Sequence, residues 1–515
     1  MRSTDQIVLG IDLGTTFSVV AYVDESGKPQ VIKNLDGDPT TPSVVLFEDG
    51  GAVVGTSAKD QSIVNAEAVV QFVKRHMGDP NFTFLSPDGK RYGAEAIAAL
   101  ILKNLKEAAE AALGRECRYA VVTVPAYFDD SQRKATQDAA MIAGLEALRI
   151  INEPTAAALA YGIEGVDRPE QVLIYDLGGG TFDVTILRVA NGELDAITTG
   201  GDRELGGKDW DDVLIARVRG ELEAKGARGI DSDPNLVQEL REKCEKAKIQ
   251  LSSREKTSVP IAIGSKRYNI EVLRRDFEEA TEMLLQRTIA LAEGCLETAG
   301  LTWGDIDKVL LVGGSTRLPK VAEELERVSG KRPSRELDPD LVVACGAAVL
   351  GAKTPVPTER GSMLTVAAAA MPEMEIRDIC SHSLGTVADD DDGVPGNSII
   401  IPKDTKLPCM VSRDFSTASD GQTAVLVQIT QGEGDDLEYV KHVGEAELAI
   451  PPYARGAPIR IQLSYDLDAI IRVQVIDLTP KPPRDLGEFA INRNANLGDD
   501  ELEALKRRIA SLATS

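Results

Sequence analysis

Basic residues are scarce in this sequence relative to acidic ones. Its 515 residues include 57 lysines and arginines against 82 aspartates and glutamates, which gives a formal net charge of −25. A surface with this charge repels nucleic-acid phosphates and anionic lipid headgroups. We therefore expect that the protein binds neither nucleic acid nor membrane.

Long apolar runs, cysteine and histidine are also scarce. No stretch approaches the roughly 18 apolar residues that a membrane-spanning helix needs, and residues 1–6 lack the apolar segment of a signal peptide. The six cysteines and three histidines are scattered, and no two cysteines have the CxxC spacing of a metal site. A cytoplasmic protein without a zinc site or a disulfide framework is expected.

The chain has enough apolar residues to build several folded domains. Hydrophobic residues make up 43% and charged residues 27%, as in ordinary globular proteins. At 515 residues the chain is too long for one compact unit, and its length indicates about two to four domains.

A pattern of strand, glycine-containing tip and strand occurs twice. Apolar strands are predicted at 7–11 and 17–23, on either side of the tip DLGTT at 12–16. The same pattern recurs around the tip DLGGG at 176–180. Because helical patterns such as 94–113 alternate with further strands, the sequence predicts a duplicated α/β fold.

Both tips have the composition of a phosphate-binding loop. Gly14 and Gly178 to Gly180 carry no side chain that would keep an anion from the backbone N–H groups. Asp12 and Asp176 stand at equivalent offsets, and two such carboxylates tolerate a polyphosphate when a hydrated Mg²⁺ lies between them. Each tip alone is also compatible with a simple tight turn, but their repetition favours a metal–nucleotide site.

A third glycine turn follows a predicted buried strand. Residues 309–312 lead into Gly313, Gly314 and Ser315, and a helix is predicted to start near Pro319. A turn of this kind lets a flat ring approach the backbone, although by itself it is weak evidence for a ligand.

Six segments together resemble one family. They are IDLGTTFS at 11–18, VPAYFDDSQR at 124–133, IINEPTAAALAYG at 150–162, YDLGGGTFDV at 175–184, CEKAKIQLSS at 244–253 and LVGGSTRLPKV at 311–321. In this order they resemble the 70-kilodalton heat-shock chaperones of DnaK type, over about residues 5–352. The resemblance implies an actin-like ATPase domain with two lobes around a nucleotide cleft, followed by a β-sandwich domain that binds peptides.

The resemblance also assigns the residues of a site for ATP or ADP and Mg²⁺. Lys74, Glu153, Thr181 and Asp183 correspond to catalytic positions, and Asp12, Glu153 and Asp176 to positions that hold Mg²⁺ through water. The nucleotide-binding positions are Gly14, Thr15, Thr16, Phe17, Gly178, Gly179, Gly180, Gly207, Glu245, Lys248, Ser252, Gly313, Gly314, Ser315, Arg317 and Asp340. One departure is Ile249, which stands where many relatives have an arginine that stacks on adenine.

A division of the chain into four segments follows from the same resemblance and from composition. They are an ATPase domain at 5–352, a linker at 353–377, a β-sandwich domain at 378–496 and a short C-terminal helix at 497–515 in place of most of the family's helical lid. In the β domain, the positions implied for an extended peptide are Phe415, Ala418, Val425 and Val427, which ordinary sandwich core would also explain. Asp389 to Asp392 would make the mouth of this cleft acidic.

The resemblance implies an ATP-dependent chaperone that binds and releases unfolded segments. Pro125, Arg133, Arg149 and Asp378 correspond to positions that couple the domains, and a J-domain co-chaperone and a nucleotide exchange factor are the expected partners. A small-molecule kinase and an ATP-dependent filament protein remain alternatives, because both share the duplicated fold.

Overall fold

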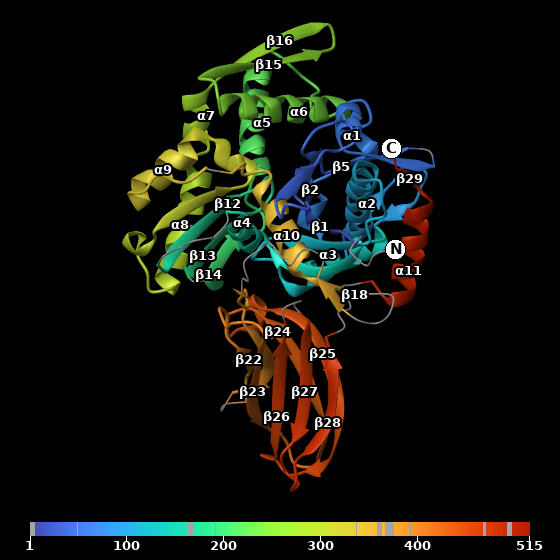
Figure 1. The fold of residues 1–515 in the computed structure, drawn as a ribbon, viewed down its shortest axis with the longest axis vertical. Helices are drawn as coiled ribbons and strands as arrows, with labels where there is room; N and C mark the ends of the chain where they lie inside the picture. The colour runs from blue at the N-terminus through green and yellow to red at the C-terminus, as the bar shows by residue number, and fades with distance from the viewer. Residues whose placement is uncertain are drawn as a thin grey trace.

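The computed structural model describes residues 6–48, 50–161, 168–190, 192–335, 337–357, 363–365, 375–390, 393–466, 470–491 and 497–514. Two α/β units lie side by side, and a unit made of strands lies below them (Figure 1). Among the described residues, no helix is long and apolar enough to cross a membrane. Residues 366–374 of the predicted linker, and Asp391 and Asp392, lie outside these ranges.

The first α/β unit contains a sheet with the order β11-β10-β1-β2-β3. Strands β1 and β2 form the predicted antiparallel hairpin, and β10 runs parallel to β1. Two helices, α2 and α3, pack against each other beside this sheet. The bounds are β1 (Val8–Asp12), β2 (Phe17–Val23), β3 (Pro29–Ile32), β10 (Tyr119–Val124), β11 (Glu146–Asn152), α2 (Ala94–Leu113) and α3 (Asp130–Ile142).

The second α/β unit repeats this arrangement. Its sheet has the order β17-β12-β13-β14-β20, in which β12 and β13 form the second predicted hairpin and β17 runs parallel to β12. In both sheets, an antiparallel hairpin is flanked by a parallel strand on one side and by an antiparallel strand on the other. The bounds are β12 (Glu170–Leu177), β13 (Phe182–Ala190), β14 (Glu193–Asp202), β17 (Lys308–Val312) and β20 (Glu375–Arg377).

Residues assigned to the linker by sequence are partly strand. Glu375–Arg377 form β20, which pairs in parallel with β14 of the second unit, and β18 (Pro355–Pro357) pairs with β19 (Met363–Thr365). The pairing of β20 could not be read from a composition rich in proline and alanine, because its partner β14 lies far away in the sequence.

Two helices join the α/β units. Helices α4 (Glu153–Ala160) and α10 (Val342–Lys353) cross each other, and α10 also packs on β1 and β2. A Cβ atom on Gly346 would lie 1.6 Å from the carbonyl oxygen of Ala156, so only glycine permits this crossing. Small residues along α10 thus bring the two sheets close enough to share an apolar core.

Further helices and strands complete both α/β units. In the second unit these are α5 (Gly207–Ala224), α6 (Pro234–Leu251), the hairpin of β15 (Lys256–Ile263) and β16 (Lys266–Leu273), α7 (Arg274–Ala280), α8 (Glu282–Thr298) and α9 (Pro319–Ser329). In the first unit they are α1 (Thr56–Gln61), β5 (Val44–Glu48), β6 (Gly51–Val54) and β7 (Val69–Gln71).

The β unit consists of two four-stranded sheets around one core. The sheet orders are β22-β21-β24-β25 and β23-β26-β27-β28. Along β26, buried and less buried residues alternate, as expected for a strand with one face on the core. The bounds are β21 (Leu384–Asp389), β22 (Pro395–Ile401), β23 (Cys409–Ser416), β24 (Gln422–Gln431), β25 (Lys441–Tyr453), β26 (Pro458–Tyr465), β27 (Ile471–Asp477) and β28 (Arg484–Ala490).

The C-terminal helix α11 (Asp499–Ser511) lies against the first α/β unit, where it contacts α2 and α3 (Figure 1). Its apolar residues Leu502 and Ile509 are part of that unit's core. Lys103 of α2 donates hydrogen bonds to the carbonyl oxygens of Ile509 at 3.2 Å and Leu512 at 2.7 Å, and β29 (Ala513–Thr514) extends the sheet at β6. The predicted helix forms, but it packs on the first unit and not over the β unit.

Candidate functional site

A cavity of about 320 Å³ lies between the two α/β units. It is lined by most of the residues that the resemblance assigned to a nucleotide site. These are Asp12, Gly14, Thr15, Thr16, Phe17, Lys74, Glu153, Asp176, Gly178, Gly179, Thr181, Glu245, Lys248, Ser252, Gly313, Gly314, Ser315, Arg317 and Asp340. The lining also includes Ile249.

The two hairpin tips meet at the floor of this cavity. A Cβ atom on Gly179 would lie 1.9 Å from Oγ1 of Thr16, and one on Gly180 would lie 2.3 Å from Cγ2 of Thr15. The glycines therefore let the tips of two hairpins touch, besides exposing backbone N–H groups. Gly180 does not line the cavity, because it is buried beneath the tip of the first hairpin.

Gly207, the first residue of α5, also lies outside the cavity lining. Its N–H donates to the carbonyl oxygen of Gly178 at 2.9 Å, and the hydroxyl of Ser315 donates to the same oxygen at 2.9 Å. These two bonds fix the orientation of the second tip.

Three carboxylates and one lysine are buried at the centre of the cavity. Lys74 is 4% exposed, and its Nζ donates to Oε1 of Glu153 at 2.5 Å. Burial lowers the pKa of Lys74, but the charges of Glu153 and Asp12 outweigh that effect and raise it. The lysine thus stays charged in a cavity that has more negative than positive groups.

The carboxylates pay an electrostatic penalty for this crowding. Burial, and then the charge of Glu153, raises the pKa of Asp12 to about 7 and also raises that of Asp176. A divalent cation would relieve this repulsion. Among the described residues, no group of three acidic, imidazole or thiol side chains is arranged to hold a metal ion directly.

Asp183 lies beside the cavity on β13. Burial raises its pKa to about 7, with Glu153 as the next cause. The backbone N–H of Tyr127 donates to Oδ1 of Asp183 at 2.9 Å. The loop before α3 therefore holds one oxygen of this carboxylate.

The far end of the cavity is built from α6 and the third glycine turn. Lys248 donates to Oδ2 of Asp211 at 2.7 Å and to the carbonyl oxygen of Gly207 at 2.8 Å. Arg317 donates from Nε to Oδ2 of Asp340 at 2.9 Å. Ile249 is 54% exposed, so this end has an apolar surface on which a flat ring can lie.

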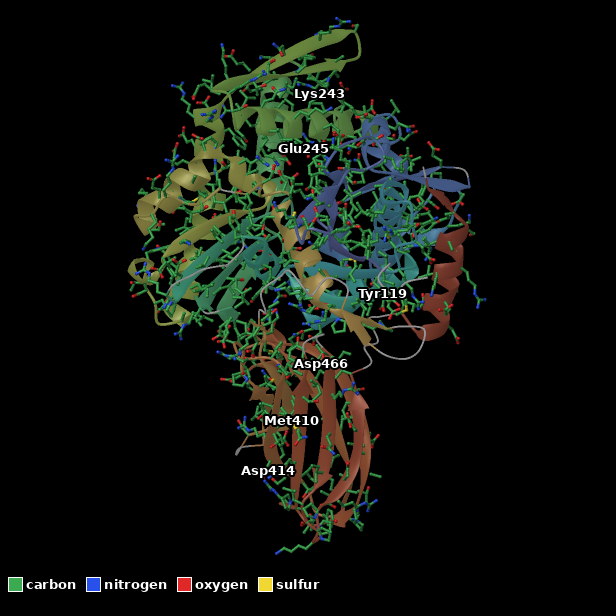
Figure 2. The ribbon with its side chains drawn as sticks, in the orientation of Figure 1. Tyr119, Lys243, Glu245, Met410, Asp414 and Asp466 are labelled. Carbon is green, nitrogen blue, oxygen red and sulfur yellow. The ribbon has the colours of Figure 1, made fainter. Side chains whose placement is uncertain are left out.

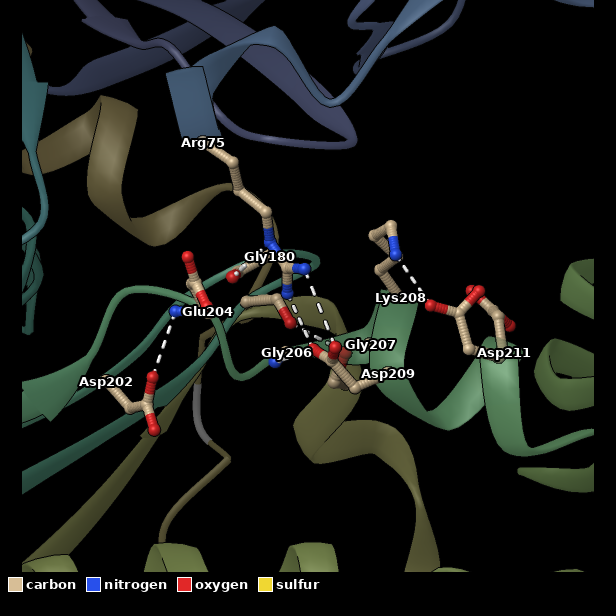
Figure 3. A network of polar contacts seen from close by, with 12 residues as sticks. Arg75, Gly180, Asp202, Glu204, Gly206, Gly207, Lys208, Asp209 and Asp211 are labelled. Carbon is tan, nitrogen blue, oxygen red and sulfur yellow. Dashed lines mark hydrogen bonds and ion pairs between the residues drawn. The ribbon is translucent and has the colours of Figure 1, made fainter. Parts of the chain in front are cut away.

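Two ionic contacts that cross between the α/β units near the cavity were not predicted from the sequence. Lys59 of α1 pairs with Glu245 of α6 at 2.6 Å. In Figure 2, Glu245 lies below the β15–β16 hairpin, at the opposite end of the molecule from the β unit, where Met410 is labelled. Arg75 donates from Nε to the carbonyl oxygen of Gly180 at 2.8 Å and pairs with Asp209 at 2.6 Å (Figure 3). Both pairs join residues more than a hundred positions apart, and no local pattern reveals them.

The cavity lining is completed by five residues to which the sequence assigned no role: Thr40, Val312, Leu318, Pro339 and Val343. They lie in loops, at the end of β17 and at helix starts, where composition alone does not indicate a ligand.

Three of the four predicted coupling residues meet where the β unit begins. Arg133 donates to Oδ1 of Asn152, whose Nδ2 donates to Oδ2 of Asp378 at 2.7 Å. Burial raises the pKa of Asp378, whereas the positive charges of Arg133 and, less strongly, Arg149 act against it. Asn152 therefore links two of the predicted residues. Pro125 starts the loop that carries Tyr127, and its carbonyl oxygen accepts from the N–H of Phe128.

The predicted peptide-binding residues belong largely to the core of the β unit. Val427 is fully buried, and Phe415 and Val425 pack against the same core. Ala418 is exposed in the loop between β23 and β24. These contacts fit the alternative interpretation, in which the residues belong to the core of the sandwich, at least as well as a role in lining a peptide cleft.

The comparison with known protein families gives one result. The model of the Hsp70 protein family matches residues 8–514. This range includes both α/β units, the β unit and α11. The chain belongs to the Hsp70 protein family.

Proposed function

We propose that this chain is a Mg²⁺-dependent ATPase that uses ATP hydrolysis to control the binding and release of extended polypeptide segments. The observation that carries the proposal is the cavity where two glycine tips, three buried carboxylates and Lys74 converge. The family is one of chaperones with ATPase activity, and the cavity contains the groups that this activity needs.

The donor set fits a hydrated Mg²⁺. Asp12, Glu153 and Asp176 supply the hard oxygen atoms that this ion prefers. The crowding of their negative charges, which contributes to the raised pKa of Asp12 and of Asp176, also favours a cation. When bound, the ion would neutralise charge on the β- and γ-phosphates of the nucleotide.

The residues of the chain would promote hydrolysis through positioning and charge. The two tips present N–H groups to the phosphates, Lys74 places a buried positive charge beside them, and Asp183 orients the attacking water. Thr181 adds a hydroxyl at the second tip. Because water and not a bound acceptor is the nucleophile, turnover is slow.

The proposal extends to the organisation of the whole chain. We assign residues 5–352 to an actin-like ATPase domain, 353–377 to the linker, 378–496 to a β-sandwich that binds peptides and 497–515 to the C-terminal helix. A cytoplasmic location, a J-domain partner and a nucleotide exchange factor complete the proposal.

The test is the rate of ATP hydrolysis by the purified full chain with and without an unfolded peptide and a J-domain protein. The proposal predicts slow, Mg²⁺-dependent hydrolysis that these partners accelerate. Phosphorylation of a small-molecule acceptor would instead support a kinase, and ATP-dependent sedimentation would support a filament protein.

A further inference from the structure

The loop between β10 and α3 separates the cavity from the β unit. On the cavity side, the N–H of Tyr127 donates to Oδ1 of Asp183 at 2.9 Å. The proposed function uses this carboxylate to orient the attacking water. Whatever fixes this N–H therefore also fixes Asp183.

On the opposite side, the same loop is held by the start of the β unit. The hydroxyl of Ser381 donates to the carbonyl oxygen of Ala126 at 2.6 Å. Nε2 of His382 lies 3.3 Å from the carbonyl oxygen of Tyr127, and the two rings meet edge to face with centroids 4.4 Å apart. Both Ser381 and His382 are buried by this contact.

The Ala126 carbonyl and the Tyr127 N–H belong to one peptide group. A peptide group is planar and turns as a unit, so a bond at its oxygen restricts the direction of its N–H. A hydrogen bond accepted at the oxygen also polarises the group and makes the N–H a stronger donor. Ser381 and Asp183 are thus joined through a single rigid group.

We propose that Ser381 is a positioning residue for ATP hydrolysis, which acts on Asp183 through the Ala126–Tyr127 peptide group. The inference rests on the proposed function, because it assumes that Asp183 orients the attacking water. The docking of the β unit would then affect the position of Asp183 in the cavity through this peptide group.

A second donor sets the size of the effect. Nη2 of Arg133 also donates to the Ala126 carbonyl, but at the longer distance of 3.3 Å. Loss of Ser381 therefore leaves the peptide group held less firmly and does not release it. The expected change in rate is that of one ordinary hydrogen bond.

The test compares three variants of the full chain in ATP hydrolysis. Ser381→Ala should lower kcat about threefold to tenfold with KM for ATP unchanged, and Ser381→Thr, which keeps the hydroxyl, should recover most of the rate. Ser383→Ala is the matched control, because its buried hydroxyl accepts from the N–H of Lys403 and contacts only the β unit. Equal rates for Ser381→Ala and Ser383→Ala, or a rise for Ser381→Ala, would overturn the proposal.

A second readout reports on the peptide group itself. Labelling the ten tyrosines with ¹⁵N gives one amide signal for each, and Tyr127→Phe identifies that of Tyr127. Ser381→Ala should move this amide proton upfield, because its hydrogen bond weakens, while Ser383→Ala should leave it in place. An unchanged Tyr127 signal in Ser381→Ala would overturn the proposal, and this result is independent of whether the chain hydrolyses ATP. A parent chain without any hydrolysis would overturn the proposed function instead.

Discussion

Single residues in the cavity show a conflict between stability and function. The pKa of Asp12 rises from its ordinary 3.8 to about 7 in the folded chain, mainly through burial. At a pH between these two pKa values, Asp12 therefore keeps its proton in the folded state but loses it in the unfolded state. As pH rises through this window, the free energy of unfolding falls.

Asp12→Asn should remove this penalty. The variant should be more stable than the parent by about 1 to 3 kcal/mol at pH 7.5 in the absence of nucleotide, and by less at pH 5. Thermal unfolding at both pH values measures the difference, and Asp36→Asn, at an exposed position, is the control. The same gain in stability at both pH values would show that burial of charge is not its cause.

Ile249 gives a prediction about nucleotide affinity. Its exposed apolar side chain lines the far end of the cavity, where the family resemblance implies an arginine. Ile249→Arg should tighten ATP binding by about threefold to tenfold, because a guanidinium stacks on the adenine ring. Titration with a fluorescent nucleotide measures the affinity. Gln250→Arg places the same charge one residue away, on an exposed position outside the cavity lining, and should have little effect.

At the scale of elements, α11 determines part of the stability of the first α/β unit. Ile509 is fully buried in that unit's core. Ile509→Ala should destabilise the first unit by about 2 to 4 kcal/mol, measured as a lower urea midpoint of its unfolding transition. Arg507→Ala, at an exposed position of the same helix, should leave that midpoint unchanged. If Ile509→Ala also left it unchanged, the packing of α11 on this unit would be wrong.

The elements themselves were largely predictable, but their partners were not. The strands that contain Asp12 and Asp176 form the expected hairpins with the strands that follow them, because apolar runs and glycine tips are local signals. The apolar side of α11 was also visible in the sequence. Its docking on α2 was not, because an apolar stripe does not specify which surface covers it.

The same limit applies to the candidate site. Motif positions such as Lys74 and Asp176 converge in the cavity as the resemblance implied. The ion pair between Lys59 and Glu245 and the contact of Ser381 with Ala126 were not foreseen. Each joins segments distant in sequence, and no periodicity connects them.

At the scale of the whole molecule, one carboxylate holds three parts together. Asp129, the N-cap of α3 in the first unit, pairs with Arg203 of the second unit and with Lys441 of the β unit, both at 2.9 Å. Burial raises the pKa of Asp129, but the charge of Lys441 and hydrogen bonds from Ser131, Lys441 and the Gln132 N–H outweigh burial and lower the pKa. The docked arrangement is therefore partly electrostatic.

Lys441→Ala should loosen the β unit from the α/β units. Scattering in solution should show a larger radius of gyration for this variant than for the parent, while Lys481→Ala, at an exposed position of the β unit, should match the parent. Added salt should bring the parent closer to the variant, since Lys441 is partly exposed and its charge is screened over about 8 Å at physiological ionic strength. Identical radii for all three proteins would mean that this pair does not contribute to docking.

The most direct test of the proposed function is single-turnover hydrolysis of ATP with Mg²⁺ by the parent, Lys74→Ala and Lys266→Ala. Lys74 is the buried positive charge at the centre of the cavity, whereas Lys266 is exposed at the β15–β16 hairpin. We predict that Lys74→Ala lowers the rate by about 10² to 10³ and still binds ATP, and that Lys266→Ala keeps the parent's rate. The parent's rate in Lys74→Ala, or no hydrolysis by the parent, would contradict the assignment of this cavity as an ATPase site.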